Sequence, residues 1–385
     1  MIFSAADIEL LRLTGWCKDL PLTSAGQEFL PEEVAALEAL GYLTVTKAKA
    51  LRLRAAGGRL LSGLGVPMPS NKWPTSKDHI LKRRYQAAAI LVTCHRAGLQ
   101  VYADCLADLK TPPVFLSSAA VRRNEELGGN VFHGTRFAGI LHLPGWSYIV
   151  HFVGPNAGGI SYLNEMKSYH SVTASLDTLS GMVFAGAGYD QVWRELAEDA
   201  PTRAGPKRAG MLQSYGEVYA ASALPVHLLS CDGTGALQLA VMCQADYRDR
   251  LTRLVLGNRF RPPEEGLPDC DGMSRERPFV LAVDMDLKRI DRACAQAHAG
   301  GYPLPGIAAL EGQSSLLKKL YETTARGVVY DIRPKALTDA FGAACALRVP
   351  SHAPFCAGGE LVHHAAPVGP TAKAVQVDGE MGNEY

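Results

Sequence analysis

A glutamate and a lysine two residues apart, in Glu165-Met166-Lys167, are the clearest pair of side chains for chemistry in this chain. They end the apolar segment ISYLNEMK, which we expect to be a strand after the Gly158-Gly159 break. Side chains alternate along a strand, so both would point to one face. There Glu165 could hold Mg²⁺ while Lys167 assists an attacking water, as in metal-dependent nucleases. Both are candidate catalytic residues, and Glu165 is the candidate metal ligand.

Such a site needs a second carboxylate, because Mg²⁺ demands near-octahedral oxygen ligands. That acid would stand on the preceding hairpin, but residues 131–164 contain no Asp or Glu. Glu125 and Glu126 lie upstream, and Glu126 is the third catalytic candidate if a helix there flanks the site. Mg²⁺ is therefore implied as a cofactor only for an active nuclease. The alternative interpretation of Glu165 and Lys167 is a surface ion pair on an edge strand.

A second acidic pair, Asp284 and Asp286, lies in FVLAVDMDLKR at the predicted carboxyl end of a strand. Open α/β sheets place ligands and metals at that edge. A D-x-D there resembles phosphotransferases of the haloacid-dehalogenase type, but their further Ser/Thr, Lys and Asp-Asp motifs are not evident. The alternative is that the pair begins a helix and complements its dipole.

Other common kinds of site find no support in the sequence. Nine cysteines are scattered without C-x-x-C or zinc-ligand spacing, which indicates reduced thiols in a cytosolic protein and no metal cluster. Neither GxSxG, GxxxxGK[ST] nor GxGxxG is present, so we expect no nucleotide cofactor. No secretory signal and no membrane span are evident, and we expect a cytoplasmic protein with no membrane partner.

Charge is unevenly distributed, although the net charge is only +1. Ten Lys or Arg and a single acid, Asp78, lie between Lys47 and Arg84. A local basic field of this kind suits a polyanion, while the alternative is a solvated strand face. We take eight of these residues as candidate contacts to double-stranded DNA: Lys47, Lys49, Arg52, Arg54, Arg59, Lys82, Arg83 and Arg84.

The first 72 residues read as helices followed by a basic hairpin, the pattern of a winged helix. Ser4 and Asp7 resemble a capping box, and the apolar stripe behind them predicts a helix to Thr14 that Gly15 ends. PEEVAALEALG predicts a helix over 31–40. YLTVTK and ALRLRA alternate with period two and predict the hairpin. The helix before the hairpin is acidic, so the base-reading element stays open.

The rest of the chain divides into four further regions. A basic linking helix is expected over 73–98 and a mixed α/β region over 99–210, with FAGILHL and SYIVHFVG as strands around Pro144-Gly145. Residues 211–345 alternate strand and helix, which predicts parallel strands with right-handed crossovers. The Ala-, Pro-, Gly- and His-rich stretch 346–385 lacks any period and is expected to be a loose tail. The predicted fold class is α/β (α+β overall), in two or three domains.

The order of a segment ending in GYLTVTKAKALRLRAAGGRLL, a basic helix, and the strand series GTRFAGILHL, SYIVHFVG and SYLNEMK is similar to the replication-relaxation family of plasmid and conjugative-element proteins. The resemblance covers about residues 1–335. It implies a winged helix joined to a restriction-endonuclease-like region. It also implies action in plasmid relaxation, mobilisation or replication. Other mobilisation or replication proteins are candidate partners, and the choice between a monomer and a homodimer stays open.

Three hypotheses follow for the function. The preferred one is a DNA-binding accessory or initiator protein of a mobile element, in which the hairpin contacts phosphates and catalysis is optional. The second is a Mg²⁺-dependent nicking endonuclease or relaxase that uses Glu165, Lys167 and one of Glu125 or Glu126. The third is a winged-helix transcriptional regulator whose α/β part senses a ligand or dimerises.

Overall fold

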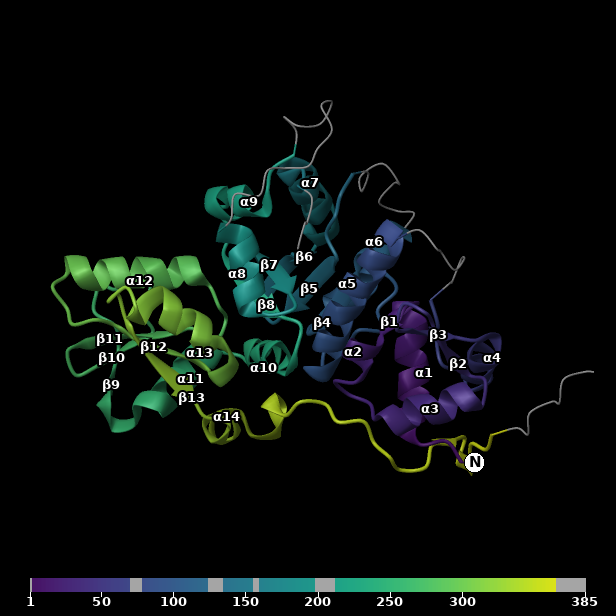
Figure 1. Cartoon of the computed structure of the whole chain (residues 1–385). Coiled ribbons are helices and arrows are strands. Elements are labelled where there is room, and N and C mark those ends of the chain that lie inside the picture. Colours follow the sequence, from purple (N-terminus) through teal and green to yellow (C-terminus); the bar gives the residue numbers. More distant parts are fainter. Residues whose placement is uncertain (1, 70–77, 124–133, 155–158, 198–211, 365–385) are drawn as a thin grey trace, which may run out of the picture.

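A computed structural model describes residues 2–69, 78–123, 134–154, 159–197 and 212–364 (Figure 1). The protein is mixed α/β, with helices packed around mixed sheets. Three groups of elements follow one another along the molecule, and the chain returns to its beginning near the C-terminus (Figure 1).

The N-terminal module consists of residues 2–69. Its three-stranded antiparallel sheet has the order β1-β3-β2. The elements are α1 (Ala5–Cys17), β1 (Leu20–Pro21), α2 (Leu22–Ala25), α3 (Pro31–Ala39), β2 (Leu43–Val45), β3 (Ala50–Leu53) and α4 (Ala55–Gly63).

Local sequence signals explain most of this module. The Ser4 hydroxyl accepts the Asp7 N–H at 3.0 Å, and the Asp7 carboxylate accepts the Ser4 N–H at 2.8 Å, which confirms the capping box of α1. Pro31 begins α3, and Gly41 follows it with a φ of 79°. The predicted end of α1 is wrong, because the helix runs through Gly15 to Cys17. A Cβ at Gly15 would lie 1.9 Å from Met68 Cε, so this glycine makes room for packing and does not end the helix.

The central region surrounds a five-stranded sheet of order β4-β5-β6-β7-β8, in which β4, β5 and β6 are antiparallel neighbours while β6, β7 and β8 are parallel. The predicted hairpin is confirmed, with Gly145 at its turn. The elements are α5 (Asp78–Arg96), η1 (Leu106–Lys110), β4 (Val114–Ser117), α6 (Ser118–Arg123), β5 (Gly139–Leu143), β6 (Trp146–Phe152), α7 (Tyr162–Thr173), β7 (Leu179–Gly186), α8 (Tyr189–Ala197), α9 (Tyr215–Ala221) and β8 (Val226–Ser230).

The strand predicted at ISYLNEMK is wrong, because this segment begins helix α7. Glu165, Tyr169 and Val172 are buried at helical spacing, and Lys167 between them is exposed. The short, mostly apolar segment from Ile160 to Leu163 is compatible with a strand or a helix. The helical spacing of apolar residues becomes evident only when Tyr169 and Val172, beyond the Glu165-Lys167 motif, are included.

A second sheet of five strands, in the order β13-β12-β11-β10-β9, follows, and its strands β11, β12 and β13 are parallel as predicted. β8, although it falls within residues 211–345, belongs to the central sheet. The elements are α10 (Gly233–Met242), α11 (Tyr247–Leu256), η3 (Gly257–Arg259), β9 (Phe260–Arg261), β10 (Gly272–Ser274), β11 (Arg277–Leu281), α12 (Leu287–Ala299), β12 (Gly306–Leu310), α13 (Glu311–Leu317), the π-helix η4 (Lys318–Glu322), β13 (Val328–Ile332), α14 (Pro334–Phe341) and η5 (Gly342–Cys345).

Residues 346–364 form a C-terminal strap that runs back along the molecule to the N-terminal module (Figure 1). Its backbone carbonyls at Ala353, Ser351 and Val362 accept the N–H groups of residues 5, 6 and 3 at 2.7–3.0 Å. The strap ends in a small hairpin of β14 (Cys356–Ala357) and β15 (Glu360–Leu361). The prediction of a loose tail is therefore wrong for residues 346–364, while residues 365–385 lie outside the described residues.

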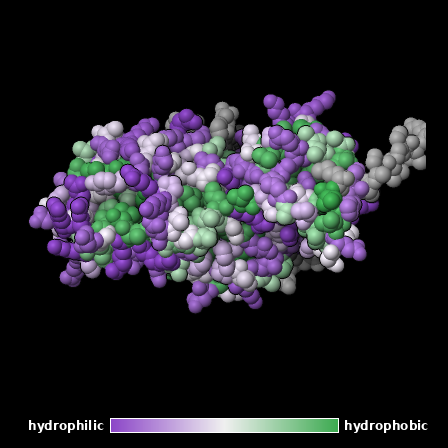
Figure 2. Space-filling model, turned by 90° about the horizontal axis from the view of Figure 1, so that it is seen from below, coloured by the Kyte–Doolittle hydropathy of each residue, from purple (hydrophilic) through white to green (hydrophobic). Residues whose placement is uncertain are grey.

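The surface seen from the side of the strap is mostly hydrophilic, with separate apolar patches (Figure 2). Within the described ranges, no helix combines the length and the apolar character that crossing a membrane requires.

Candidate nucleic-acid interface

Two of the eight basic candidates are engaged inside the protein. Asp19, fully buried after α1, forms ion pairs with Arg52 on β3 and with Arg84 on α5, the latter at 2.7 Å. A buried carboxylate is stable only when such partners compensate it. Arg52 and Arg84 therefore fasten the hairpin to α5, and this tertiary role was not predicted.

The other six candidates have exposed side chains. Lys47 and Lys49 lie in the turn between β2 and β3, where Lys49 has a φ of 56°. Among the described residues, no carboxylate forms an ion pair with five of these six: Lys47, Lys49, Arg54, Arg59 and Arg83. Their positive charges are thus not neutralised by ion pairs among the described residues.

Further basic side chains continue this surface onto α6, which lies beside the first turns of α5 (Figure 1). Burial lowers the pKa of Lys18, and the nearby charges of Arg123 and Arg84 lower it further. Arg83 acts in the same way on the pKa of Arg122. These couplings place Lys18 near Arg123, and Arg122 near Arg83. We call the following residues the basic surface: Lys18, Lys47, Lys49, Arg54, Arg59, Lys82, Arg83, Arg122 and Arg123.

Sequence reasoning missed Lys18, Arg122 and Arg123, because each is remote from the basic run along the chain. Only the packing of α5 against the N-terminal module and the central sheet brings them to it. Lys72 and Lys77, which belong to the run, lie outside the described residues.

The predicted nuclease pair does not share a face. Glu165 is fully buried on α7, and its carboxylate accepts the backbone N–H groups of Arg136 at 2.5 Å and Phe137 at 3.2 Å. Lys167 is exposed, since residues two apart on a helix point in nearly opposite directions. The expected common face of Glu165 and Lys167 is wrong for this reason.

The remaining ligands of the predicted metal site are not brought to Glu165 by the described structure. Glu125 and Glu126 lie outside the described residues. The hairpin β5–β6 carries no carboxylate. Across the described ranges, no group of three His, Cys, Asp or Glu side chains is arranged to hold a metal ion. Glu165 instead holds the chain entering β5.

Glu165 nevertheless has an unusual titration. Burial raises the pKa of Glu165 to about 7, although the two backbone N–H groups and the charge of Arg122 favour its ionised form. In the unfolded chain this carboxyl ionises near its ordinary value of 4.5. Its raised pKa therefore stabilises the fold below pH 4.5, and this contribution is lost as the pH rises through about 7.

We expect Glu165→Gln to remove this pH dependence. Between pH 4.5 and 8, the wild type should lose up to about 3 kcal/mol more unfolding free energy than the variant. Urea denaturation at several pH values measures this difference. Glu265→Gln, at an exposed position, is the control and should follow the wild type. Parallel curves for wild type and Glu165→Gln would contradict the assigned titration.

The acidic pair at the end of β11 is engaged in structure. Asp284 is fully buried, forms an ion pair with Arg248, and accepts the Tyr247 hydroxyl at 3.0 Å. Asp286 accepts the Arg289 N–H at 3.1 Å and caps α12. The geometry matches the helix-start interpretation of Asp286. The carboxyl edge of β11 is covered by β8 of the central sheet, because the Met285 carbonyl accepts the Leu228 N–H at 3.2 Å and the Asp284 carbonyl lies 2.9 Å from His227 Nδ1.

A buried histidine joins the N-terminal module to α5. His95 is fully buried, with Nδ1 at 2.7 Å from Glu28 Oε1 and Nε2 at 2.6 Å from Glu9 Oε1. The Tyr102 hydroxyl donates to Glu9 Oε1 at 2.5 Å, and Arg348 of the strap lies 3.3 Å from the same oxygen. No sequence motif indicates this cluster, because its members come from four separate segments.

Comparison with known proteins adds no identification. No protein-family model, no curated protein and no solved structure matches the chain. Evidence on function beyond the sequence itself therefore comes from the geometry and the charge of the described residues.

Proposed function

We propose that the protein binds double-stranded DNA as an accessory or initiator protein of a mobile element, acting in plasmid relaxation, mobilisation or replication. The observation that carries DNA binding is the basic surface, most of whose members have no carboxylate partner among the described residues. A groove or face of one charge attracts a polyanion and raises its rate of association. Neutralising phosphates also releases counterions from the duplex.

The order of elements supports a winged helix as the binding module. A helix, a short strand, two helices and a hairpin follow one another in residues 5–53. In such an arrangement the hairpin tip, here Lys47 and Lys49, presses against phosphates. The candidate base-reading helix α3 carries Glu32, Glu33 and Glu38, so phosphate contacts dominate over base contacts in this proposal.

An accessory role is favoured over DNA nicking by the position of Glu165. Both of its oxygens accept backbone N–H groups, and Lys167 points away from it. A two-oxygen acceptor already satisfied in this way is a poor Mg²⁺ ligand, because the ion needs several carboxylate or water oxygens at one point. The mobile-element role itself rests on the similarity to the replication-relaxation family.

Fluorescence anisotropy of a labelled duplex tests DNA binding by the full-length protein. We expect binding that weakens with salt, with a slope of log K against log salt of about −0.9 for each phosphate contacted. In parallel, supercoiled plasmid with Mg²⁺ should stay supercoiled. Open-circle product that disappears in Glu165→Ala would overturn the accessory role in favour of nicking. Failure to bind any duplex would overturn the proposal.

A further inference from the structure

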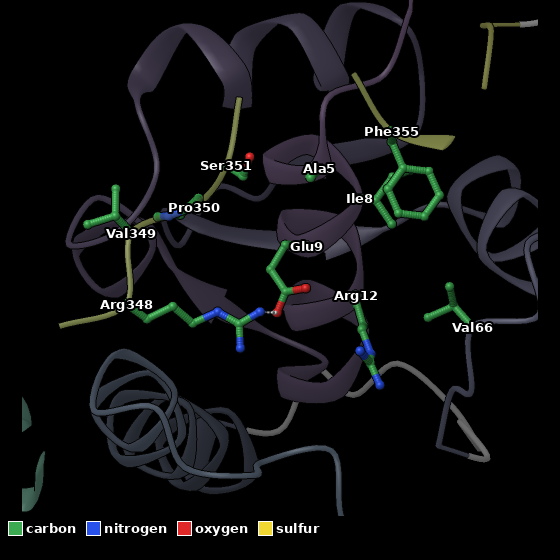
Figure 3. A pocket seen from close by; sticks show the side chains of 10 residues that line it. All are labelled: Ala5, Ile8, Glu9, Arg12, Val66, Arg348, Val349, Pro350, Ser351 and Phe355. Carbon is green, nitrogen blue, oxygen red and sulfur yellow. Dashed lines mark ion pairs between the residues drawn. The ribbon is translucent and has the colours of Figure 1, made fainter. Parts of the chain in front are cut away.

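A cavity of about 340 Å³ lies between α1 and the C-terminal strap (Figure 3). Ile8 and Val66 line it from the N-terminal module, and Phe355 lines it from the strap. Glu9, Arg12 and Arg348 bring charge to the same space. Its volume lies in the range of small-molecule sites, which are mostly apolar with a few convergent polar groups.

Arg12 is not engaged by any acid in the described structure. Its guanidinium carbon lies 3.6 Å from the centroid of the Tyr102 ring, which holds the side chain in place. Its Nε is buried and has no hydrogen-bond partner among the described residues. Arg12 nevertheless lines the cavity, and no acid among the described residues pairs with its charge, so its guanidinium can pair with a ligand carboxylate.

Glu9 stands one helical turn before Arg12, on the same face of α1. The two side chains form no ion pair with each other in the described structure. Instead His95, Tyr102 and Arg348 all contact Oε1 of Glu9. Figure 3 shows its carboxylate extending into the cavity between Arg348 and Arg12. The second oxygen, Oε2, accepts no hydrogen bond from the described residues and can accept one from a ligand.

We propose that this cavity binds a small zwitterion with an apolar side chain, of the chemical class of an aromatic or branched α-amino acid. The ligand carboxylate pairs with Arg12, the ammonium group donates to Glu9, and the side chain packs against Ile8, Val66 and Phe355. The strap forms one wall, so the bound molecule touches both α1 and residues 348–355. This inference is independent of the proposed DNA binding.

Three matched compounds test the contributions of the carboxylate and of the ammonium group to binding. L-Phenylalanine has both charges, 3-phenylpropionate lacks the amine, and 2-phenylethylamine lacks the carboxylate. Isothermal titration of the full-length protein should show L-phenylalanine binding at least about tenfold more tightly than either analogue, since one lost charge-assisted contact is worth about a factor of ten. No binding of L-phenylalanine, or equal affinity for an analogue, overturns the proposal.

Variants then locate the site. Arg12→Gln should weaken L-phenylalanine at least about tenfold while leaving 2-phenylethylamine unchanged. Arg194→Gln, on the exposed face of α8, removes the same charge elsewhere and should bind like the wild type. Val66→Phe fills the cavity without touching a charge, and it should abolish binding. Wild-type affinity for L-phenylalanine in Arg12→Gln or in Val66→Phe overturns the site.

Discussion

Replacing Lys47, Lys49, Arg54 and Arg83 together by alanine should make the salt dependence of duplex binding shallower by about 3.6 in slope, at about 0.9 for each phosphate contact. Between 50 and 200 mM salt, the wild type should then lose about 150-fold more affinity than the variant. These four residues are exposed and have no carboxylate partner among the described residues, so their loss removes charge without breaking an internal ion pair. Anisotropy titrations across that salt range measure the effect.

Arg52 and Arg84 are deliberately kept in this variant. Both compensate the buried carboxylate of Asp19, and their removal would mix loss of folding with loss of binding. The matched control changes the net charge equally on the second half of the chain, at four exposed positions: Arg194, Arg261, Lys319 and Lys335. If the control lowers the salt slope as much as the test variant, overall charge and not the basic surface controls binding.

His95→Ala should destabilise the protein by about 3–5 kcal/mol, the usual cost of removing one partner from a buried charged cluster. The change leaves Glu9 and Glu28 facing each other without the imidazolium between them. Urea denaturation followed by tryptophan fluorescence measures the loss. His298→Ala, at an exposed position on α12, is the control and should change stability little. A loss as small as that of the control would show that His95 holds no charge in the fold.

The pH dependence of this cluster has a definite sign. Burial alone lowers the pKa of His95, but its hydrogen bonds to Glu28 and Glu9 outweigh burial and raise the pKa. The resulting stabilisation is full below the ordinary value of 6.5 and is lost as the pH rises through the raised value. The same contacts hold the pKa of Glu9 at about 2 despite its burial, so its contribution is lost as the pH falls from 4.5 toward 2. The cluster therefore stabilises most between about pH 4.5 and 6.5.

Local signals were sufficient where a structure depends on neighbouring residues. The capping pair of Ser4 and Asp7, the proline and glycine around α3, and the turn Pro144-Gly145 all act within a few residues, and each was predicted. The strand prediction at Glu165 was wrong because a short apolar run is compatible with both a strand and a helix. Burial of Tyr169 and Val172 beyond the motif decides for the helix.

Prediction of the candidate site failed where contacts between residues distant in the sequence determine which basic side chains are paired and which lie close together. The basic run was visible because it is continuous along the chain. The pairing of Arg52 and Arg84 through Asp19 was not visible, and neither was the approach of Arg122, because these residues meet only through tertiary packing. The strap lacks a hydrophobic period because backbone hydrogen bonds to residues 3–6 hold it, and these carry no side-chain signature.

The strap also has a consequence for the order in which the protein is made. Synthesis on the ribosome releases the N-terminal module first, and domains generally fold as they emerge. Yet the Tyr42 hydroxyl lies 2.7 Å from His364 Nδ1, a residue 322 positions later in the chain, and Glu9 receives Arg348 from the same late segment. The N-terminal module thus gains these contacts only after residues 348–364 have been synthesised.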